Sequence, residues 1–243
     1  IFSKLKGVGR VKLEEIIKIE GFDIKNPEDI VSSIIKQRIV KIDKDALINA
    51  QEIAENDIQK SEKNASKIIS ILDNEYPEIL RKTVGKPTIL YIKGQMPKLP
   101  SVAIIGTREP TDHGKIITER ISQYFSENGW NIVSGLALGC DTIAHQTAVK
   151  NKSHTTAVLA HGLDTISPKS NEKLSEEILS TGGTLLTEYE FGAKPKPYQY
   201  AQRDLIQAGL SQGVIMIQSD IKGGSLIASS AAIKYGRILA VPN

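Results

Sequence analysis

From residue 101 onward the chain alternates short apolar runs with amphipathic segments of helical period, and this alternation limits the folds open to it. Apolar runs occupy 102–105, 131–134, 155–160, 184–187, 213–217 and 238–241, and helical patterns lie near 111–128, 141–150, 171–181, 200–210 and 225–235. Strands that are each followed by a helix form a parallel sheet with right-handed crossovers. The pattern therefore predicts an α/β fold with a doubly wound, mostly parallel sheet.

The first part of the chain shows helical patterns without strands. Apolar spacing at 11–22, an Asn26-Pro27 helix start and a helical period at 45–60 all point the same way. A chain of 243 residues also exceeds the usual single domain. We expect a small helical domain at 1–62 and an α/β domain at 63–243, whose first part holds a short helix and a strand.

The charge balance directs attention to local sites. The whole chain carries 31 basic and 28 acidic residues, of which 18 and 15 lie in residues 1–100. Residues 101–243 therefore carry 13 basic and 13 acidic residues, and this part has no bulk positive field to attract a polyanion. An anion site in this part must be built locally.

Other features indicate a cytoplasmic protein that has no membrane partner. No apolar run approaches the roughly 20 residues that span a bilayer. The chain starts at Ile1 without a basic and then apolar leader, and its one cysteine, Cys140, suits a reducing compartment. A single cysteine also excludes a cysteine metal cluster, and we expect no metal and no cofactor.

The loop after the first predicted strand is suited to a phosphate. It contains Gly106, Thr107, Arg108 and Thr111, but lacks the further glycines of a dinucleotide fingerprint. The second strand ends in Ser134 and Gly135 instead of an acidic residue for a ribose hydroxyl. Hydroxyls and a guanidinium fork at a helix start bind phosphate. In the alternative interpretation, the glycines serve tight turns and Arg108 pairs with Glu109.

A second candidate cradle begins the last predicted helix. Lys222 and the N–H groups of Gly224 and Ser225 precede that helix in the way that the first loop precedes its own. The alternative is that this turn only starts the helix. Lys115 and Arg203 are further candidates, although a lone basic residue on a helix usually faces solvent.

Several polar residues have structural interpretations. Thr111, Asp141, Asn171 and Ser225 stand where helix N-caps belong, and we interpret the Asp141 and His145 pair as structural instead of catalytic or metal-binding. His161 and Asp164 follow the third strand, where they would line a pocket. We identify no catalytic residue.

The motifs together resemble the DprA/Smf family of DNA-processing proteins, which act in natural transformation. The resemblance rests on "AIIGTREPTDHG", "IVSGLALGCDTIAHQTA", "LLTEYEFG" and the stretch from "LIQAGLSQG" to "AVPN", and covers nearly the whole chain. It implies an extended Rossmann-like domain that binds single-stranded DNA, forms homodimers and delivers the strand to the RecA recombinase. It implies no enzyme activity, and "LKGVG" near the N-terminus resembles a helix-hairpin-helix glycine turn.

At several positions the chain differs from the residue that is common in the family. These are Leu138, Asp204, Leu205, Gln218 and Gly223, where the family often has Arg, Asn, Arg, Glu and Ser. The loss of basic residues among them bears on the strength of DNA binding. The winged-helix-like C-terminal domain of many family members is expected to be absent from this sequence or removed from it.

Two functions of different classes remain open. The first is a non-enzymatic module that binds single-stranded DNA through phosphate contacts and through stacking on aromatic residues, namely Tyr189, Phe191, Tyr198 and Tyr200. The second is a nucleotide-processing enzyme or a nucleotide-ligand sensor that uses the same pocket. The "KGGSLIASS" turn lacks the glutamate that a related hydrolase motif carries, which favours the binding module.

Overall fold

The computed structural model describes residues 1–18, 44–220 and 223–242. The chain divides into two compact units, Ile1–Lys63 and Asn64–Asn243. The predicted Asn26-Pro27 helix start and Lys222 of the second candidate cradle lie outside the described residues.

The described part of the first unit is helical. It contains a 3-10 turn, η1 (Phe2–Lys4), and the helices α1 (Arg10–Ile17) and α3 (Lys44–Lys63). Leu5, Val8, Ile16 and Ala50 form its apolar core, and Lys4 pairs with the buried Asp57 of α3. The predicted glycine turn lies between η1 and α1, with Gly7 at a φ of 82°. In the ranges that the structure describes, none of the helices has both the length and the apolar character needed to cross a membrane.

The second unit is an eight-stranded sheet with helices on both faces. Its strands are β1 (Ser66–Ser70), β2 (Ile89–Gly94), β3 (Ser101–Ile105), β4 (Asn131–Ser134), β5 (Thr155–Val158), β6 (Thr184–Thr187), β7 (Gly213–Met216) and β8 (Ile238–Ala240). Its helices are α4 (Glu78–Arg81), α5 (Asp112–Glu127), α6 (Cys140–Lys150), α7 (Glu172–Ser180), α8 (Pro197–Gly209) and α9 (Ser225–Lys234), with a 3-10 turn η2 (Lys169–Asn171).

The strand order creates a crevice at one edge of the sheet. The order is β1-β2-β6-β5-β4-β3-β7-β8, and every pair from β6 to β8 is parallel. The chain runs outward from β3 through β4 and β5 to β6, and then returns to place β7 on the other side of β3. The loops that follow β3 and β7 therefore diverge, and such a switch point is where open α/β sheets bind ligands.

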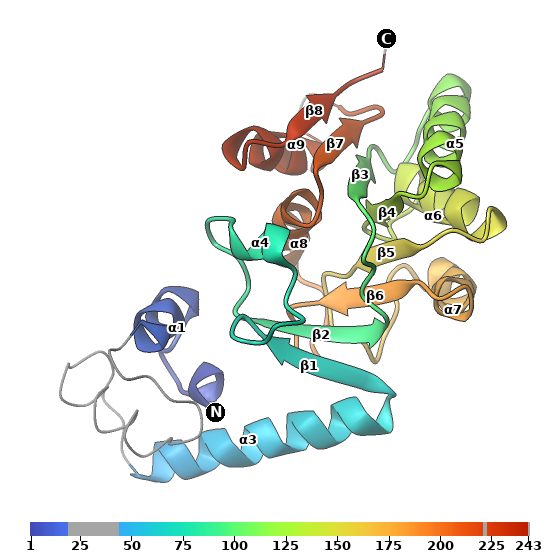
Figure 1. Ribbon diagram of the computed structural model, residues 1–243. Coiled ribbons are helices and arrows are strands. Elements are labelled where there is room, and N and C mark those ends of the chain that lie inside the picture. Colours follow the sequence, from blue (N-terminus) through green and yellow to red (C-terminus); the bar gives the residue numbers. More distant parts are fainter. Residues whose placement is uncertain (19–43, 221–222, 243) are drawn as a thin grey trace. The chain divides into compact units, whose positions relative to one another are not determined.

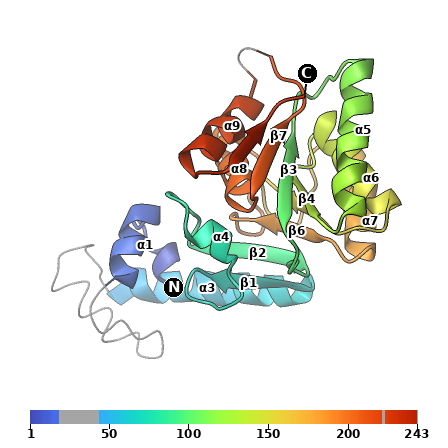
Figure 2. The ribbon, with the colours of Figure 1, turned by 45° about the horizontal axis from the view of Figure 1, so that its top comes forward.

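Two layers of helices bury the sheet. Figure 1 and Figure 2 show α5, α6 and α7 on one face, and α4, α8 and α9 on the other. On the first face, Ile117, Ile121 and Phe125 of α5 pack against Val102, Ile104 and Ile132. On the second face, Ile206 of α8 and Ala228, Ala231 and Ala232 of α9 pack against Ala103, Ile105 and Val214. Tyr124 of α5 faces solvent and is 63% exposed.

The predicted α/β class with a doubly wound, mostly parallel sheet is confirmed, and two kinds of detail differ. The strand β1 was not predicted; it pairs antiparallel with β2, which pairs antiparallel with β6. Thr111 caps α5 as expected, since its Oγ1 accepts the Gly114 N–H at 3.1 Å. Asn171 also stands at the N-cap position of α7, but its side chain donates to the Leu136 carbonyl and does not cap the helix. The caps predicted at Asp141 and Ser225 are wrong, because the N-cap residues of α6 and α9 are Gly139 and Gly224.

At the end of β2 the backbone of Gly94 lies very close to the backbone of Gly183, and two glycine substitutions test this close approach. Gly94 and Gly182 have similar left-handed φ values of 90° and 83°, but only Gly94 meets a neighbour, since its Cβ would lie 2.1 Å from the Gly183 carbonyl oxygen. Gly182→Ala should cost about 1–2 kcal/mol of unfolding free energy for the backbone alone. Gly94→Ala should cost about 1–3 kcal/mol more, because the sheet must open. Equal losses in urea unfolding would contradict this close approach.

Candidate functional site

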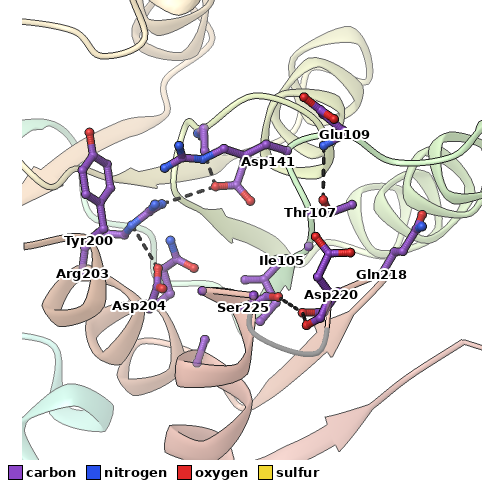
Figure 3. Close-up of a pocket in the computed structure, with 18 residues that line it drawn as sticks. Ile105, Thr107, Glu109, Asp141, Tyr200, Arg203, Asp204, Gln218, Asp220 and Ser225 are labelled. Carbon is purple, nitrogen blue, oxygen red and sulfur yellow. Dashed lines mark hydrogen bonds and ion pairs between the residues drawn. The ribbon is translucent and has the colours of Figure 1, made fainter. Parts of the chain in front are cut away.

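A cavity of about 460 Å³ lies at the switch point, between the loops that follow β3 and β7 and the helix α8. Gly106, Thr107 and Arg108 line it from the first loop, and Gly224 and Ser225 line it from the second. The structure therefore brings these residues of the two predicted cradles to one cavity, whereas Thr111 of the first cradle does not line it (Figure 3). The remaining lining residues are Ile105, Glu109, Ala137, Asp141, Tyr200, Arg203, Asp204, Gln207, Gln218, Ser219, Asp220, Gly223 and Ala228.

Arg108 is the exposed cation among the described residues that line the cavity. Its guanidinium carbon lies 5.5 Å from the centre of the Tyr200 ring on α8, which is the distance of a cation–π contact. The two side chains also line a smaller neighbouring pocket with Leu138 and Pro168. A guanidinium and an aromatic ring side by side can hold a phosphate and stack a base.

Arg203, by contrast, is buried in an ion-pair network. Its Nη1 lies 3.3 Å from Oδ2 of Asp141, and its Nε lies 3.1 Å from Oδ1 of Asp204. Figure 3 shows the Arg203 side chain reaching between these two carboxylates. Only 5% of Arg203 is exposed, so this arginine organises the floor of the cavity and is not presented to a ligand as Arg108 is.

Gly135 is needed for this network. A Cβ at Gly135 would lie 0.9 Å from Nη1 of Arg203, so the guanidinium occupies the space that any side chain here would fill. The Gly135 N–H donates to Oδ2 of Asp141 at 3.1 Å, and the Ala137 N–H donates to the same oxygen. Asp141 therefore joins Arg203 to the loop after β4, in place of the predicted N-cap role.

Gln218 occupies the polar groups of the first predicted cradle. Its carbonyl accepts the Thr107 N–H at 2.8 Å, and its Oε1 accepts the N–H and the hydroxyl of Thr111 at 3.1 and 3.2 Å. The Thr107 hydroxyl accepts the Glu109 N–H. These hydrogen bonds join the β3 and β7 loops at one side of the cavity, and the Arg108 guanidinium takes no part in them. Gly106 lies against Cys140, whose Sγ would be 2.5 Å from a Cβ there.

The second loop offers two backbone amides. Among the described residues, the N–H groups of Gly224 and Ser225 have no hydrogen-bond partner, whereas the Gly223 N–H donates to the Asp220 carbonyl. The Ser225 hydroxyl donates to the Ser219 hydroxyl at 2.7 Å. The first turn of α9 thus places two donors that have no partner in the described part of the chain at the cavity wall.

The other candidates lie outside the cavity. Lys115 pairs with Asp112 on the surface of α5, and the buried Ser134 hydroxyl donates to the Ile104 carbonyl. The expectation that His161 and Asp164 line the pocket is wrong. His161 is buried and accepts the Ser167 N–H through Nε2, and Asp164 accepts the Gly192 N–H.

The predicted aromatic platform is only partly available. Phe191 is buried and packs edge-on against Tyr91, so it cannot stack on a base. Tyr198 on α8 is 59% exposed, and Tyr200 lies beside Arg108. In the ranges that the structure describes, no group of three His, Cys, Asp or Glu residues is placed to hold a metal ion.

The interior of the cavity is acidic although its rim carries Arg108. Four carboxylates, of Glu109, Asp141, Asp204 and Asp220, line it against two guanidinium groups. Burial raises the pKa of Asp204 to about 6, and Asp141 adds to that rise, whereas Arg203 and Arg108 oppose it. The buried His145, bonded to the Thr155 hydroxyl at 2.7 Å, has a pKa lowered by burial to about 4 and stays neutral.

Comparisons with known proteins give a consistent result. Residues 67–243 match the family model described as DNA recombination-mediator protein A. The chain is 33% identical over its full length to protein Smf of Synechocystis sp., covering 63% of that protein. It is 36% identical to the DNA processing protein DprA of Bacillus subtilis over 72% of the chain and 60% of the relative. The chain thus spans about three fifths of the length of these curated relatives.

Two solved structures share the fold. The DNA processing protein A of Streptococcus pneumoniae superposes with a TM-score of 0.81 at 30% identity, over 99% of this chain and 84% of that one. The DNA processing protein A of Helicobacter pylori, solved to describe its single-stranded DNA binding mode, gives a TM-score of 0.67 at 34% identity, over 73% of this chain and 81% of that one.

The pKa of Asp204 gives a test of the network. The pKa of Asp204 is about 6 in the folded state and near 3.8 in an unfolded chain. Ionisation of Asp204 therefore lowers the unfolding free energy, and this loss grows as the pH rises from 4 to 6. Asp204→Asn should remove this cost, since an amide oxygen still accepts from Arg203. The variant should gain up to roughly 3 kcal/mol over the parent at pH 7 and little at pH 4.

The control for this measurement is Asp220→Asn, which changes an exposed carboxylate of the same cavity and should alter the unfolding free energy by less than about 0.5 kcal/mol. If the difference in unfolding free energy between the parent and Asp204→Asn did not change between pH 4 and pH 7, burial would not raise the pKa of Asp204, and the prediction would be wrong.

Proposed function

The chain belongs to the DNA recombination-mediator protein A family, and we propose that it binds single-stranded DNA at the cavity between the β3 and β7 loops. The observation that carries the proposal is the pair of Arg108 and Tyr200 at the mouth of this cavity. Non-specific binding of single strands combines a cation for the phosphates with an aromatic face for the bases, and this pair supplies both.

The neighbouring groups extend this binding surface. The Gly224 and Ser225 amides lie across the cavity from Arg108 and are suited to a second phosphate. Arg203, Ser134 and Gly135 contribute indirectly, because they hold the loops and the floor in place. Gly106, Thr107 and Thr111 fix the loop that presents Arg108. Lys222 lies outside the described residues and stays a candidate by its place in the sequence, and Lys115 would contact DNA only if the strand ran along α5.

The proposed activity is binding, not catalysis. Asp141 is not free to act as an acid or base, because its Oδ2 accepts from Gly135, Ala137 and Arg203. The acidic interior also disfavours a fully buried phosphate group. A nucleotide sensor using the same cavity is the alternative, and a comparison of single strands with free nucleotides separates the two.

The family relationship supports two further parts of the proposal. We infer that the bound strand is passed to the RecA recombinase during natural transformation, and that the protein acts in the cytoplasm, where such recombination occurs. We also infer a homodimer. Its support in the fold is the sheet edge at β8, where Ile238 is 74% and the following Val241 55% exposed.

Arg108→Ala tests the binding proposal. It should weaken binding of single strands of any sequence by about 10-fold, because a charge-assisted contact to phosphate is lost. The slope of log affinity against log salt should fall by roughly 0.7, the value for one phosphate contact on a single strand. Both quantities come from fluorescence anisotropy titrations with a labelled oligonucleotide at several salt concentrations.

Arg120→Ala is the matched control, since it removes an exposed arginine from α5 outside the cavity. It should leave affinity and slope close to those of the parent. Tyr200→Ala should weaken binding by loss of stacking while the salt slope stays unchanged, and Tyr200→Phe should bind as the parent does. If Arg108→Ala and Arg120→Ala had equal effects, DNA would bind elsewhere.

The dimer has its own test. Light scattering should report a species larger than the 26.6 kDa of this chain. Ile238→Lys places a charge on the exposed edge strand and should shift the mass toward the monomer without loss of stability. A parent that stays monomeric at high concentration would contradict the dimer, and a dimer unaffected by Ile238→Lys would place the interface away from β8.

A further inference from the structure

We propose that Asp204 makes this cavity selective for a guanine base in the bound strand. The inference rests on the proposed function, because it concerns which base enters the cavity beside Arg108 and Tyr200. Asp204 lines the cavity and is held there by Arg203, so it places a fixed carboxylate among the groups that a base would meet.

The cavity has two chemically different ends. The cation Arg108 is exposed at the rim, whereas Asp204 lies inside, with 13% of its side chain accessible. A phosphate is attracted to the rim and repelled from the interior. A nucleotide would therefore enter with its phosphate at Arg108 and its base directed inward, and a volume of about 460 Å³ accommodates a base.

Asp204 has one oxygen for the protein and one for a ligand. Oδ1 accepts from Nε of Arg203 at 3.1 Å, which fixes the orientation of the carboxylate. Among the residues that the structure describes, none donates a hydrogen bond to Oδ2. This oxygen faces the Gly224 turn, where a Cβ on the glycine would be 3.8 Å away, and so opens into the cavity. Figure 3 shows Asp204 beside Arg203, within the ring of lining residues.

Guanine matches such an acceptor better than the other bases. An ionised carboxylate only accepts hydrogen bonds, and a buried acceptor without a donor is unfavourable. The Watson–Crick edge of guanine presents two adjacent donors, N1–H and N2–H, whereas thymine presents one donor between two carbonyls that Oδ2 would repel. Adenine and cytosine present a single amino group next to a ring acceptor.

The experiment compares four oligonucleotides of about 12 nucleotides, a length in the range of a single-strand site. One consists of thymidine alone, and in the other three every third base is changed to guanine, adenine or cytosine. The spacing avoids guanine runs. At pH 7.5 the parent should bind the guanine strand about 10-fold more tightly than the others, the discrimination expected of one good base contact.

Asp204→Asn is the decisive variant, because it is isosteric and is expected to fold stably. Its amide oxygen turns to Arg203, so its NH₂ faces the cavity and donates instead of accepting. The guanine preference should disappear, while binding of the thymidine strand should tighten because a negative charge is removed. Arg108→Ala should weaken all four strands alike and keep the preference.

The outcomes separate this inference from the function it rests on. Equal binding of the four strands by the parent, or a guanine preference that survives Asp204→Asn, overturns the role of Asp204 and leaves the binding function standing. Failure to bind any strand overturns the proposed function itself. If dGMP at about 1 mM displaces the guanine strand and dAMP does not, guanine recognition is supported. The cavity would then accept guanine from a free nucleotide as well as from a strand.

Discussion

The buried guanidinium of Arg203 holds together the elements that form the site. It lies between the carboxylates of Asp141 on α6 and Asp204 on its own helix α8, and so links the two helix layers beneath the ends of the parallel strands. A buried arginine without partners would be strongly unfavourable. The two carboxylates and the amide of Gln207 supply these partners, and the absence of a side chain at Gly135 leaves room for the guanidinium. In the amide orientation that satisfies both groups, Gln207 accepts from Nη1 at 2.7 Å.

This network also determines where charge is available. Two carboxylates surround one buried guanidinium, so the floor of the cavity is acidic. Among the described lining residues, the exposed cation is Arg108 on the rim. The strand order places that rim at the switch point beside Tyr200. The proposed binding of a single strand, with phosphates outside and a base inside, is a consequence of this separation of charge. An evenly basic groove would bind the backbone without distinguishing the bases.

The sequence was sufficient for most of the fold because the signals are local. The apolar runs 131–134 and 184–187 coincide with β4 and β6, and Thr111 caps α5 as its type and position predict. Strand β1 was not predicted because the four residues "KIIS" follow a polar segment and are too few to show the alternation typical of a strand. The cap expected at Asp141 failed because the carboxylate binds a guanidinium 62 residues away, which no local pattern reveals.

The same limit applies to the site. The loop with Arg108 was identified from its position after a strand, and the structure places it at the cavity. The burial of Arg203 and the role of Gln218 in joining Thr107 and Thr111 depend on contacts between distant segments. Phe191 was expected among stacking residues because it is aromatic and follows a strand, but its ring completes the core against Tyr91.

The central claim is that a single strand crosses the cavity at Arg108 and Tyr200, and photo-crosslinking tests it most directly. A single-stranded oligonucleotide carrying a photoreactive thymine analogue would be irradiated on the parent protein, and the attached peptides identified by mass spectrometry. The account predicts crosslinks in α8 at Tyr200 and in the loop that follows β3. Crosslinks confined to other surfaces, such as α7 or the pocket lined by Met96 and Leu99 at the opposite ends of the strands, would contradict it.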